Sequence, residues 1–303
     1  MKHRVLLVSD MHYTTDLSEA ELKKTHPEST ASLASGSAFG YTQREKIDFI
    51  TRAVREEHAA SPLDAVLVLG DLSIDDYDYR RLPVNYCEKF RNECMSVLPC
   101  PAYAIPGNHD SYPDEEWRRV FGVGRQFALE IGGCTFVLAD TFAAVPAHGA
   151  SGAAYTSADV SFLRRALEEH PAGPVFLCAH YIADREDDAD FRAFVAAEER
   201  VAALFRGHTH KDRLFTFGGK PAADIGGYGY DGRSVNGKYI FTVFDPAWAW
   251  GYEILEWDDD GFFLYHVKPA IHYEGSNGSF DVPHTVAGEY RAPFSAACRP
   301  AED

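Results

Sequence analysis

The sequence predicts an α/β fold with a largely parallel sheet, and two features of the chain support this prediction. Five short apolar runs end abruptly in polar residues, and these runs cover residues 5–8, 65–69, 102–105, 175–178 and 201–205. Continuous apolar runs of this length are typical of strands buried on both faces. Helical patterns lie between several of them. Repeated strand–helix–strand order predicts that ligands collect beyond the carboxyl ends of the strands.

Three segments show the patterns expected of helices. Residues 42–58 open with a Thr-Gln-Arg-Glu capping box and continue with apolar residues at helical spacing. Residues 156–159, Thr-Ser-Ala-Asp, repeat the capping signal before a second helical pattern. A third pattern runs over residues 83–97. The connection over residues 13–40 lacks periodicity, and both a disordered surface loop and a substrate lid fit it.

The later chain is richer in strand signals than the first half. Residues 126–131 and 134–139, joined by Gly132 and Gly133, predict a hairpin. Short β-rich segments follow after residue 210, at 239–244, 251–257 and 262–267, and they predict a second sheet. We expect one domain of two packed sheets over residues 1–275. Residues 276–303 then form a C-terminal extension that packs on the domain or is partly disordered.

The charge of the chain limits its binding partners. The 303 residues include 29 Lys and Arg against 46 Asp and Glu, a formal net charge of -17. A long nucleic acid is therefore a poor partner, because its backbone must be gripped by cations. A small phosphate ester remains a fitting substrate, since bound divalent cations reverse the local field.

The sequence also indicates where the protein resides. The apolar run at residues 5–8 is too short for a signal peptide or a membrane span, so no membrane association is expected. The six cysteines form no C-x-x-C pair, and we expect reduced thiols in a cytoplasm. The oligomeric state has no sequence signal.

Metal-ligating residue types gather at the ends of all five predicted strands. They are Asp10 and His12 in a D-x-H pair, Asp71 after Gly70, Asn108 with His109 and Asp110, His180, and the pair His208 and His210. Each alone has an ordinary explanation, such as a turn, a solvated strand end or a core histidine. Together they predict a metal site at one rim of a sheet, and mixed nitrogen and oxygen ligands suit Zn, Mn, Fe or Co.

In this order, the motifs resemble the pattern of the calcineurin-like metallophosphoesterase superfamily: D-x-H, G-D, G-N-H-[DE], a lone H and G-H-x-H. The resemblance spans about residues 4 to 210 and covers the later chain only loosely. It implies a four-layer α/β/β/α sandwich of two mixed sheets flanked by helices. It also implies that Asp10, His12 and His210 hold one metal ion, that Asn108, His180 and His208 hold another, and that Asp71 bridges the two.

The same resemblance implies that His109 approaches the leaving-group oxygen as acid or charge stabiliser, with Asp110 orienting its ring. Two cations about 3.5–4 Å apart can clamp phosphoryl oxygens and lower the pKa of a bridging water toward about 7, so that hydroxide attacks in line. The expected function is metal-dependent hydrolysis of a phosphate ester.

Three hypotheses about that function stay open. The first is a phosphodiesterase for a small substrate of the cyclic-nucleotide or glycerophosphodiester type, and the aromatic residues Tyr228, Tyr230, Trp248 and Trp250 could stack on a base or pack in the core. The second is a phosphomonoesterase or phosphoprotein phosphatase. The third is a non-catalytic scaffold with the same fold, which predicts that ligands are missing, whereas every expected ligand is present.

Overall fold

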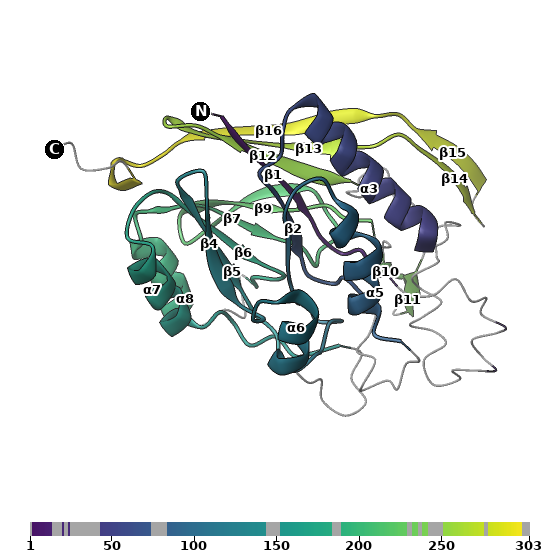
Figure 1. The fold of residues 1–303 in the computed structure, drawn as a ribbon, viewed down its shortest axis with the longest axis horizontal. Helices are drawn as coiled ribbons and strands as arrows, with labels where there is room; N and C mark the ends of the chain where they lie inside the picture. Colours follow the sequence, from purple (N-terminus) through teal and green to yellow (C-terminus); the bar gives the residue numbers. More distant parts are fainter. Residues whose placement is uncertain are drawn as a thin grey trace.

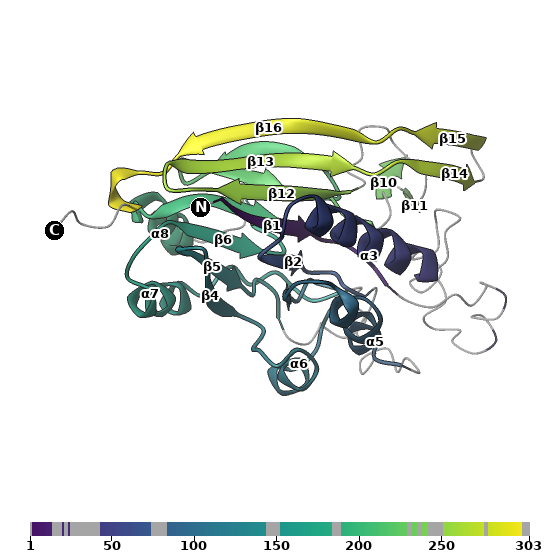
Figure 2. The same ribbon diagram turned by 45° about the horizontal axis from the view of Figure 1, so that its top comes forward.

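The computed structural model describes most of the chain: residues 2–13, 20, 24, 43–73, 84–143, 152–183, 189–228, 232–235, 238–241, 251–275 and 278–298. This part forms four layers, with two six-stranded mixed sheets stacked face to face and helices on the outer face of each (Figures 1 and 2). The predicted α/β/β/α sandwich is confirmed. Most of the connection over residues 13–40 lies outside the described residues.

The first sheet has the strand order β16-β13-β12-β1-β2-β3. Its strands are β1 His3–Val8, β2 Ala65–Leu69, β3 Ala102–Ile105, β12 Tyr252–Trp257, β13 Gly261–Lys268 and β16 Thr285–Pro293. The strands β1, β2 and β3 run parallel, whereas β12, β13 and β16 add antiparallel neighbours beside β1. The prediction that segments 251–257 and 262–267 build the second sheet was wrong. They complete the first sheet because β12 pairs with the side of β1 that β2 leaves open.

The second sheet has the order β4-β5-β6-β7-β9-β8. Its strands are β4 Phe127–Ile131, β5 Cys134–Ala139, β6 Val175–Ala179, β7 Val201–Arg206, β8 Arg213–Phe217 and β9 Lys220–Asp224. The predicted hairpin is confirmed as β4 and β5. Two further sheets have two strands each, β10 Gly232–Val235 with β11 Lys238–Phe241 and β14 Ile271–Gly275 with β15 Gly278–Val282. Strands β14 and β15 extend the ribbon of β13 and β16 (Figure 2).

The helices cover the outer faces of the two sheets (Figure 1). They are α3 Gln43–Ala60, α5 Tyr86–Glu93, α6 Asp114–Phe121, α7 Val160–Glu169 and α8 Ala189–Ala197, with short 3₁₀ turns η1 Met95–Val97 and η2 Ala296–Cys298. Side chains alternate along each strand, so β1 sends Leu6 and Val8 toward α3 and α5 while Val5 and Leu7 pack between the sheets. Helices α7 and α8 bury a third apolar cluster against the second sheet.

Two helix starts differ from the sequence patterns. Helix α5 begins only after Asn85, whose side chain caps the backbone N–H of Glu88. Helix α7 begins at Val160, and its N-cap is Asp159, the last residue of the predicted capping signal, rather than Thr156, the first. Ser157 has a left-handed φ of 63°, which is incompatible with an α-helical turn.

None of the helices in the described part of the chain combines the length and the apolar character that a bilayer span requires. All six cysteines are free thiols, and five of them are buried.

Candidate metal centre

The loops that follow five strands, three in the first sheet and two in the second, meet at one end of the sandwich. The first sheet supplies Asp10 and His12 after β1, Asp71 after β2 and Asn108 after β3, and the second supplies His180 after β6 and His208 and His210 after β7. The expectation that one sheet carries all of them was wrong. Two parallel strand groups point their carboxyl ends at a shared edge, and the site forms between them.

Five of the seven candidate ligands have a left-handed backbone. The φ angles are 54° for Asp10, 44° for His12, 49° for Asp71, 68° for His208 and 53° for His210. Among the other described residues apart from glycine, Ser157 alone has a positive φ. Such conformations are costly and cluster at functional sites. They also show that the D-x-H and H-x-H pairs are not extended strand ends, so alternation along a strand does not explain where their side chains point.

Asp10, His12 and His210 form the first group of ligands. Asp10 Oδ1 lies 3.2 Å from His210 Nε2 and 3.8 Å from His12 Nε2. The two Nε2 atoms of His12 and His210 are 3.1 Å apart. Asp10 and His12 are buried, and Asp10 Oδ1 has no hydrogen-bond partner of normal geometry among the described residues. A carboxylate oxygen and two imidazole nitrogens that converge in this way match the donor set of a transition-metal ion.

Asn108, His180 and His208 form the second group. Asn108 Oδ1 lies 2.9 Å from His208 Nδ1 and 3.2 Å from His180 Nε2. His208 therefore belongs to this group and His210 to the first, although they are two residues apart. Because both residues have a positive φ, the chain turns sharply between them.

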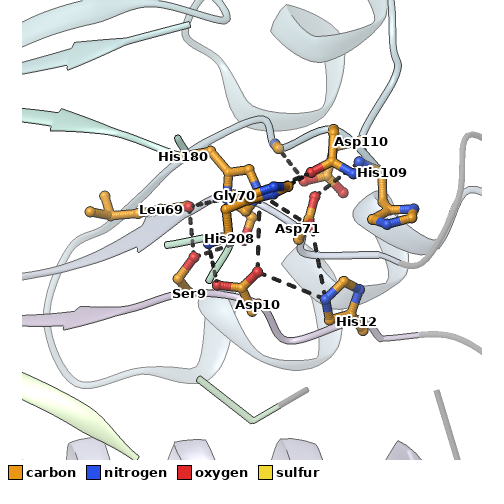
Figure 3. Close-up of polar contacts among 12 residues, drawn as sticks. Ser9, Asp10, His12, Leu69, Gly70, Asp71, His109, Asp110, His180 and His208 are labelled. Carbon is orange, nitrogen blue, oxygen red and sulfur yellow. Dashed lines mark hydrogen bonds and ion pairs between the residues drawn. The ribbon is translucent and has the colours of Figure 1, made fainter. Parts of the chain in front are cut away.

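Asp71 stands between the two groups (Figure 3). Its Oδ2 lies 3.2 Å from His180 Nε2 and 3.8 Å from His12 Nε2. Its Oδ1 accepts a 2.9 Å hydrogen bond from the backbone N–H of His109, which fixes the carboxylate. One oxygen of Asp71 thus faces ligands of both groups, as a bridging ligand must.

Backbone contacts orient the ligands from behind. His180 Nδ1 lies 2.7 Å from the carbonyl oxygen of Leu69, so this nitrogen carries the proton and Nε2 faces the site. A Cβ at residue 70 would overlap the His180 ring, and Gly70 itself has a φ of 89°. The absence of a side chain at Gly70 therefore allows the His180 ring to pack against the backbone of this residue.

The electrostatics of the groups fit bound cations. Burial disfavours the charged ring of His180, but the Asp71 carboxylate outweighs it and raises the pKa of His180 to about 9. With Nδ1 donating to Leu69, the extra proton sits on Nε2, between Asp71 and Asn108. Burial lowers the pKa of His208 to about 4, so this ring is neutral and ready to ligate. In the absence of a metal ion, the proton on His180 partly neutralises the negative charge of Asp71 and Asp10, which a bound metal ion would neutralise instead.

His109 and Asp110 have different surroundings. His109 is half-buried, and its ring lies edge-on to that of His12 with centroids 5.4 Å apart. The expectation that Asp110 orients His109 does not match its contacts. The buried Asp110 carboxylate accepts backbone N–H groups from Leu72, Ser73 and Gly107 at 2.9 to 3.0 Å. Asp110 therefore ties the loop after β2 to the turn that carries Asn108 and His109.

Two aromatic residues near the site, Phe142 and Tyr181, were not predicted from the sequence. The centroid of the Phe142 ring lies 5.6 Å from that of His180 and 6.0 Å from that of His208. The ring centroids of Tyr181 and His208 are 4.4 Å apart. Tyr181 could have been found as the neighbour of His180, whereas Phe142 follows β5 without any motif. Tyr228 is fully buried in the core, and Tyr230, Trp248 and Trp250 lie outside the described residues.

Comparison with known proteins gives three further findings. A family profile described as calcineurin-like phosphoesterase matches residues 3–212. No curated protein matches the chain. The fold is similar to the crystal structure of a dimetal phosphatase from Danio rerio, with 12% identity, a TM-score of 0.60, and 97% of this chain and 99% of that chain covered.

Two more distant structures also align. GAP50, the anchor in the inner membrane complex of Plasmodium, shares 11% identity over 95% of this chain and 90% of its own, with a TM-score of 0.46. Vps29 of Chaetomium thermophilum shares 11% identity over 97% of this chain and 98% of its own, with a TM-score of 0.39.

Proposed function

This chain belongs to the calcineurin-like phosphoesterase family, and on that basis we propose that it hydrolyses a small phosphodiester with two metal ions. The observation that carries the proposal is the position of Asp71. Its Oδ2 faces His180 of one ligand group and His12 of the other. Shared ligation by one carboxylate holds two cations close enough to act on one phosphoryl group.

The proposed ligand sets follow the two groups. Asp10, His12 and His210 hold one ion, while Asn108, His180 and His208 hold the second, and Asp71 serves both. When bound, the two ions neutralise charge on the phosphoryl oxygens and acidify a water molecule. Mn, Fe, Zn and Co all suit these ligands.

His109 is the proposed acid for the leaving group. Its half-buried ring lies beside His12, so it can reach a substrate held at the ligand groups. If this ring donates a proton to the departing oxygen, the leaving group departs as a neutral alcohol and not as an alkoxide, which is a poor leaving group. Asp110 supports the step indirectly, because it fixes the turn that carries His109.

Among the described residues, the contacts of Arg206 favour a diester substrate over a monoester. A monoester dianion carries more negative charge and calls for an additional cationic side chain. Arg206 is one cation close to the groups, with its guanidinium 5.3 Å from the ring centroid of Tyr181. It is buried and already engaged by Asp224, whose Oδ1 lies 2.5 Å from Arg206 Nε, and by the carbonyl of Ile182. It therefore has little capacity to bind phosphate.

The test is hydrolysis of bis(p-nitrophenyl) phosphate against p-nitrophenyl phosphate by metal-stripped protein reloaded with Mn²⁺, Zn²⁺ or Co²⁺. We expect metal-stimulated turnover with preference for the diester. A panel of cyclic nucleotides and glycerophosphodiesters would then be assayed in the same way. A clear preference for the monoester would overturn the diester assignment and favour a phosphomonoesterase. Absence of turnover with every metal would overturn the enzymatic proposal and favour a scaffold.

A further inference from the structure

A second cluster of metal-ligating side chains lies outside the two ligand groups. It consists of Asp212, Glu253 and His266, each of which offers a ligand atom within 4.8 Å of those of the other two. Glu253 on β12 and His266 on β13 are direct cross-strand partners in the first sheet. Asp212 lies between β7 and β8 of the second sheet. The cluster therefore joins the two sheets.

The Glu253 carboxylate is buried with one oxygen unsatisfied. Glu253 is 2% exposed and His266 is 1% exposed. Glu253 Oε1 lies 2.8 Å from His266 Nδ1 and accepts a 3.2 Å hydrogen bond from the backbone N–H of Gly226. Glu253 Oε2 is buried without any hydrogen bond in the described part of the chain. A buried carboxylate oxygen left in this state is costly unless a cation or a proton reaches it.

Asp212 adds a second carboxylate to this region. Burial raises the pKa of Glu253 to about 7, and the charge of Asp212 acts in the same direction. When Glu253 and Asp212 are both ionised, their two negative charges exceed the single positive charge of a protonated His266. The region therefore favours a bound cation on grounds of both charge and geometry.

We propose that Asp212, Glu253 and His266 bind a third divalent cation, separate from the two ions of the catalytic centre. Two carboxylates and one imidazole suit Mn²⁺, Zn²⁺ or Co²⁺ better than Ca²⁺ or Mg²⁺, which take mainly oxygen ligands. The remaining coordination positions would be filled by water, since Asp212 is half-buried rather than enclosed.

The third ion would have a structural role. Asp212 follows His210 by two residues, so a cation bound by Asp212, Glu253 and His266 would connect the loop that carries His208 and His210 to β12 and β13. The cluster also reaches β1, because Gly226 donates to Glu253 while its own carbonyl accepts the backbone N–H of Ser9 at 3.3 Å. Ser9 precedes Asp10 in the first ligand group. The ion would thus hold two segments that carry catalytic ligands.

A competing explanation uses protons and a lysine in place of a metal ion. The pKa of His266 is raised because the charges of Glu253 and Asp212 outweigh its burial, and Lys268 lies near enough to oppose this shift. Under this explanation the protonated ring and Lys268 would balance the carboxylates. The two explanations predict different amounts of bound metal.

The first experiment counts metal ions. The full-length chain is stripped with a chelator, reloaded with Mn²⁺ or Zn²⁺, gel-filtered and measured by inductively coupled plasma mass spectrometry. We expect Glu253→Gln to retain one ion per chain fewer than wild type, and Asp71→Asn to keep one ion after the catalytic pair is lost. Glu256→Gln is the matched control, since Glu256 lies on the same strand but pairs with Arg4 at 2.9 Å, and its metal content should equal that of wild type.

Equal metal content in wild type and Glu253→Gln, or complete loss of metal in Asp71→Asn, would overturn the third site. The Asp71→Asn arm also separates this proposal from the proposed catalysis, because it counts metal without activity. If Glu253→Gln fails to fold, crystals of the wild-type protein soaked in Mn²⁺ or Zn²⁺ decide the matter. An anomalous-scattering peak between Glu253 and His266 supports the site, and peaks at the catalytic centre alone reject it.

Discussion

Asp10 Oδ2 accepts a 2.8 Å hydrogen bond from the backbone N–H of His208, and this contact joins the end of β1 in one sheet to the end of β7 in the other. The other oxygen of Asp10 faces His12 and His210. Asp71 repeats the arrangement, with Oδ1 bound to the backbone N–H of His109 and Oδ2 directed into the site. Each carboxylate is therefore held in place by the backbone and presents one oxygen to a ligand group, which preorganises the site for metal ions.

Replacement of Asp71 should release both metal ions of the catalytic centre. Asp71→Ala deletes the oxygen that faces His12 and His180, so we expect turnover of bis(p-nitrophenyl) phosphate to fall below detection and metal content to decrease. Asp258→Ala, in an exposed turn after β12, is the control and should behave as wild type. Wild-type activity in Asp71→Ala would contradict the bridging role.

Replacement of His109 should separate catalysis from metal binding. His109→Ala keeps the backbone N–H that holds Asp71, so metal content should equal that of wild type. Without the proton donor, kcat should fall on the order of 10²–10⁴-fold. Metal analysis together with steady-state kinetics tests both statements, and a loss of metal would refute the assignment.

Replacement of Asp110 should instead reduce stability. Asp110→Asn exchanges one carboxylate oxygen for an amide group that donates, and this group would oppose at least one of the backbone N–H groups of Leu72, Ser73 and Gly107. We expect the free energy of unfolding to decrease by about 1.5–3 kcal/mol, measured in urea on the metal-free protein. His109→Ala should change it much less. Equal stability of Asp110→Asn and wild type would show that the carboxylate is not holding the two loops.

Metal affinity should increase with pH. The pKa of His180 is raised to about 9 in the metal-free protein, so near neutral pH its Nε2 carries a proton that a metal ion must displace. Between neutral pH and that pKa, apparent affinity for the second ion should rise by up to about tenfold per pH unit. Calorimetric titrations in buffers of different ionisation enthalpy should detect release of a proton near neutral pH and little release above pH 9. A pH-independent proton count would refute this.

The glycine before Asp71 should be required for the position of His180. Gly70→Ala would place a Cβ against the His180 ring, so we expect loss of metal as well as loss of stability. Gly122→Ala is a matched control because Gly122 also has a positive φ, 76°, but nothing lies within 4 Å of the added atom. Both variants carry the strain of a left-handed alanine, and only Gly70→Ala should lower metal content. Similar metal content in the two variants would show that His180 adjusts freely.

The sequence predicted most of the elements that surround the site. Strands β2 and β3 have the predicted bounds, and the hairpin of β4 and β5 was recognised from its two glycines. These elements depend on local signals, namely apolar runs and turn residues. The allocation of β12 and β13 to the first sheet had no local signal, because it depends on pairing between β1 and a segment almost 250 residues later.

The sequence by itself determined which donor types are available at the strand ends, since Asp, Asn and His there are the residue types that metal ions take as ligands. The tertiary structure decided how these donors are divided. His208 and His210 belong to different ligand groups because both adopt a left-handed backbone. Asp110 connects two loops because backbone N–H groups surround its carboxylate. The Asp212, Glu253 and His266 cluster likewise exists only where two sheets meet. A side chain's type is local, whereas its direction and neighbours depend on backbone angles and long-range contacts that the whole fold imposes.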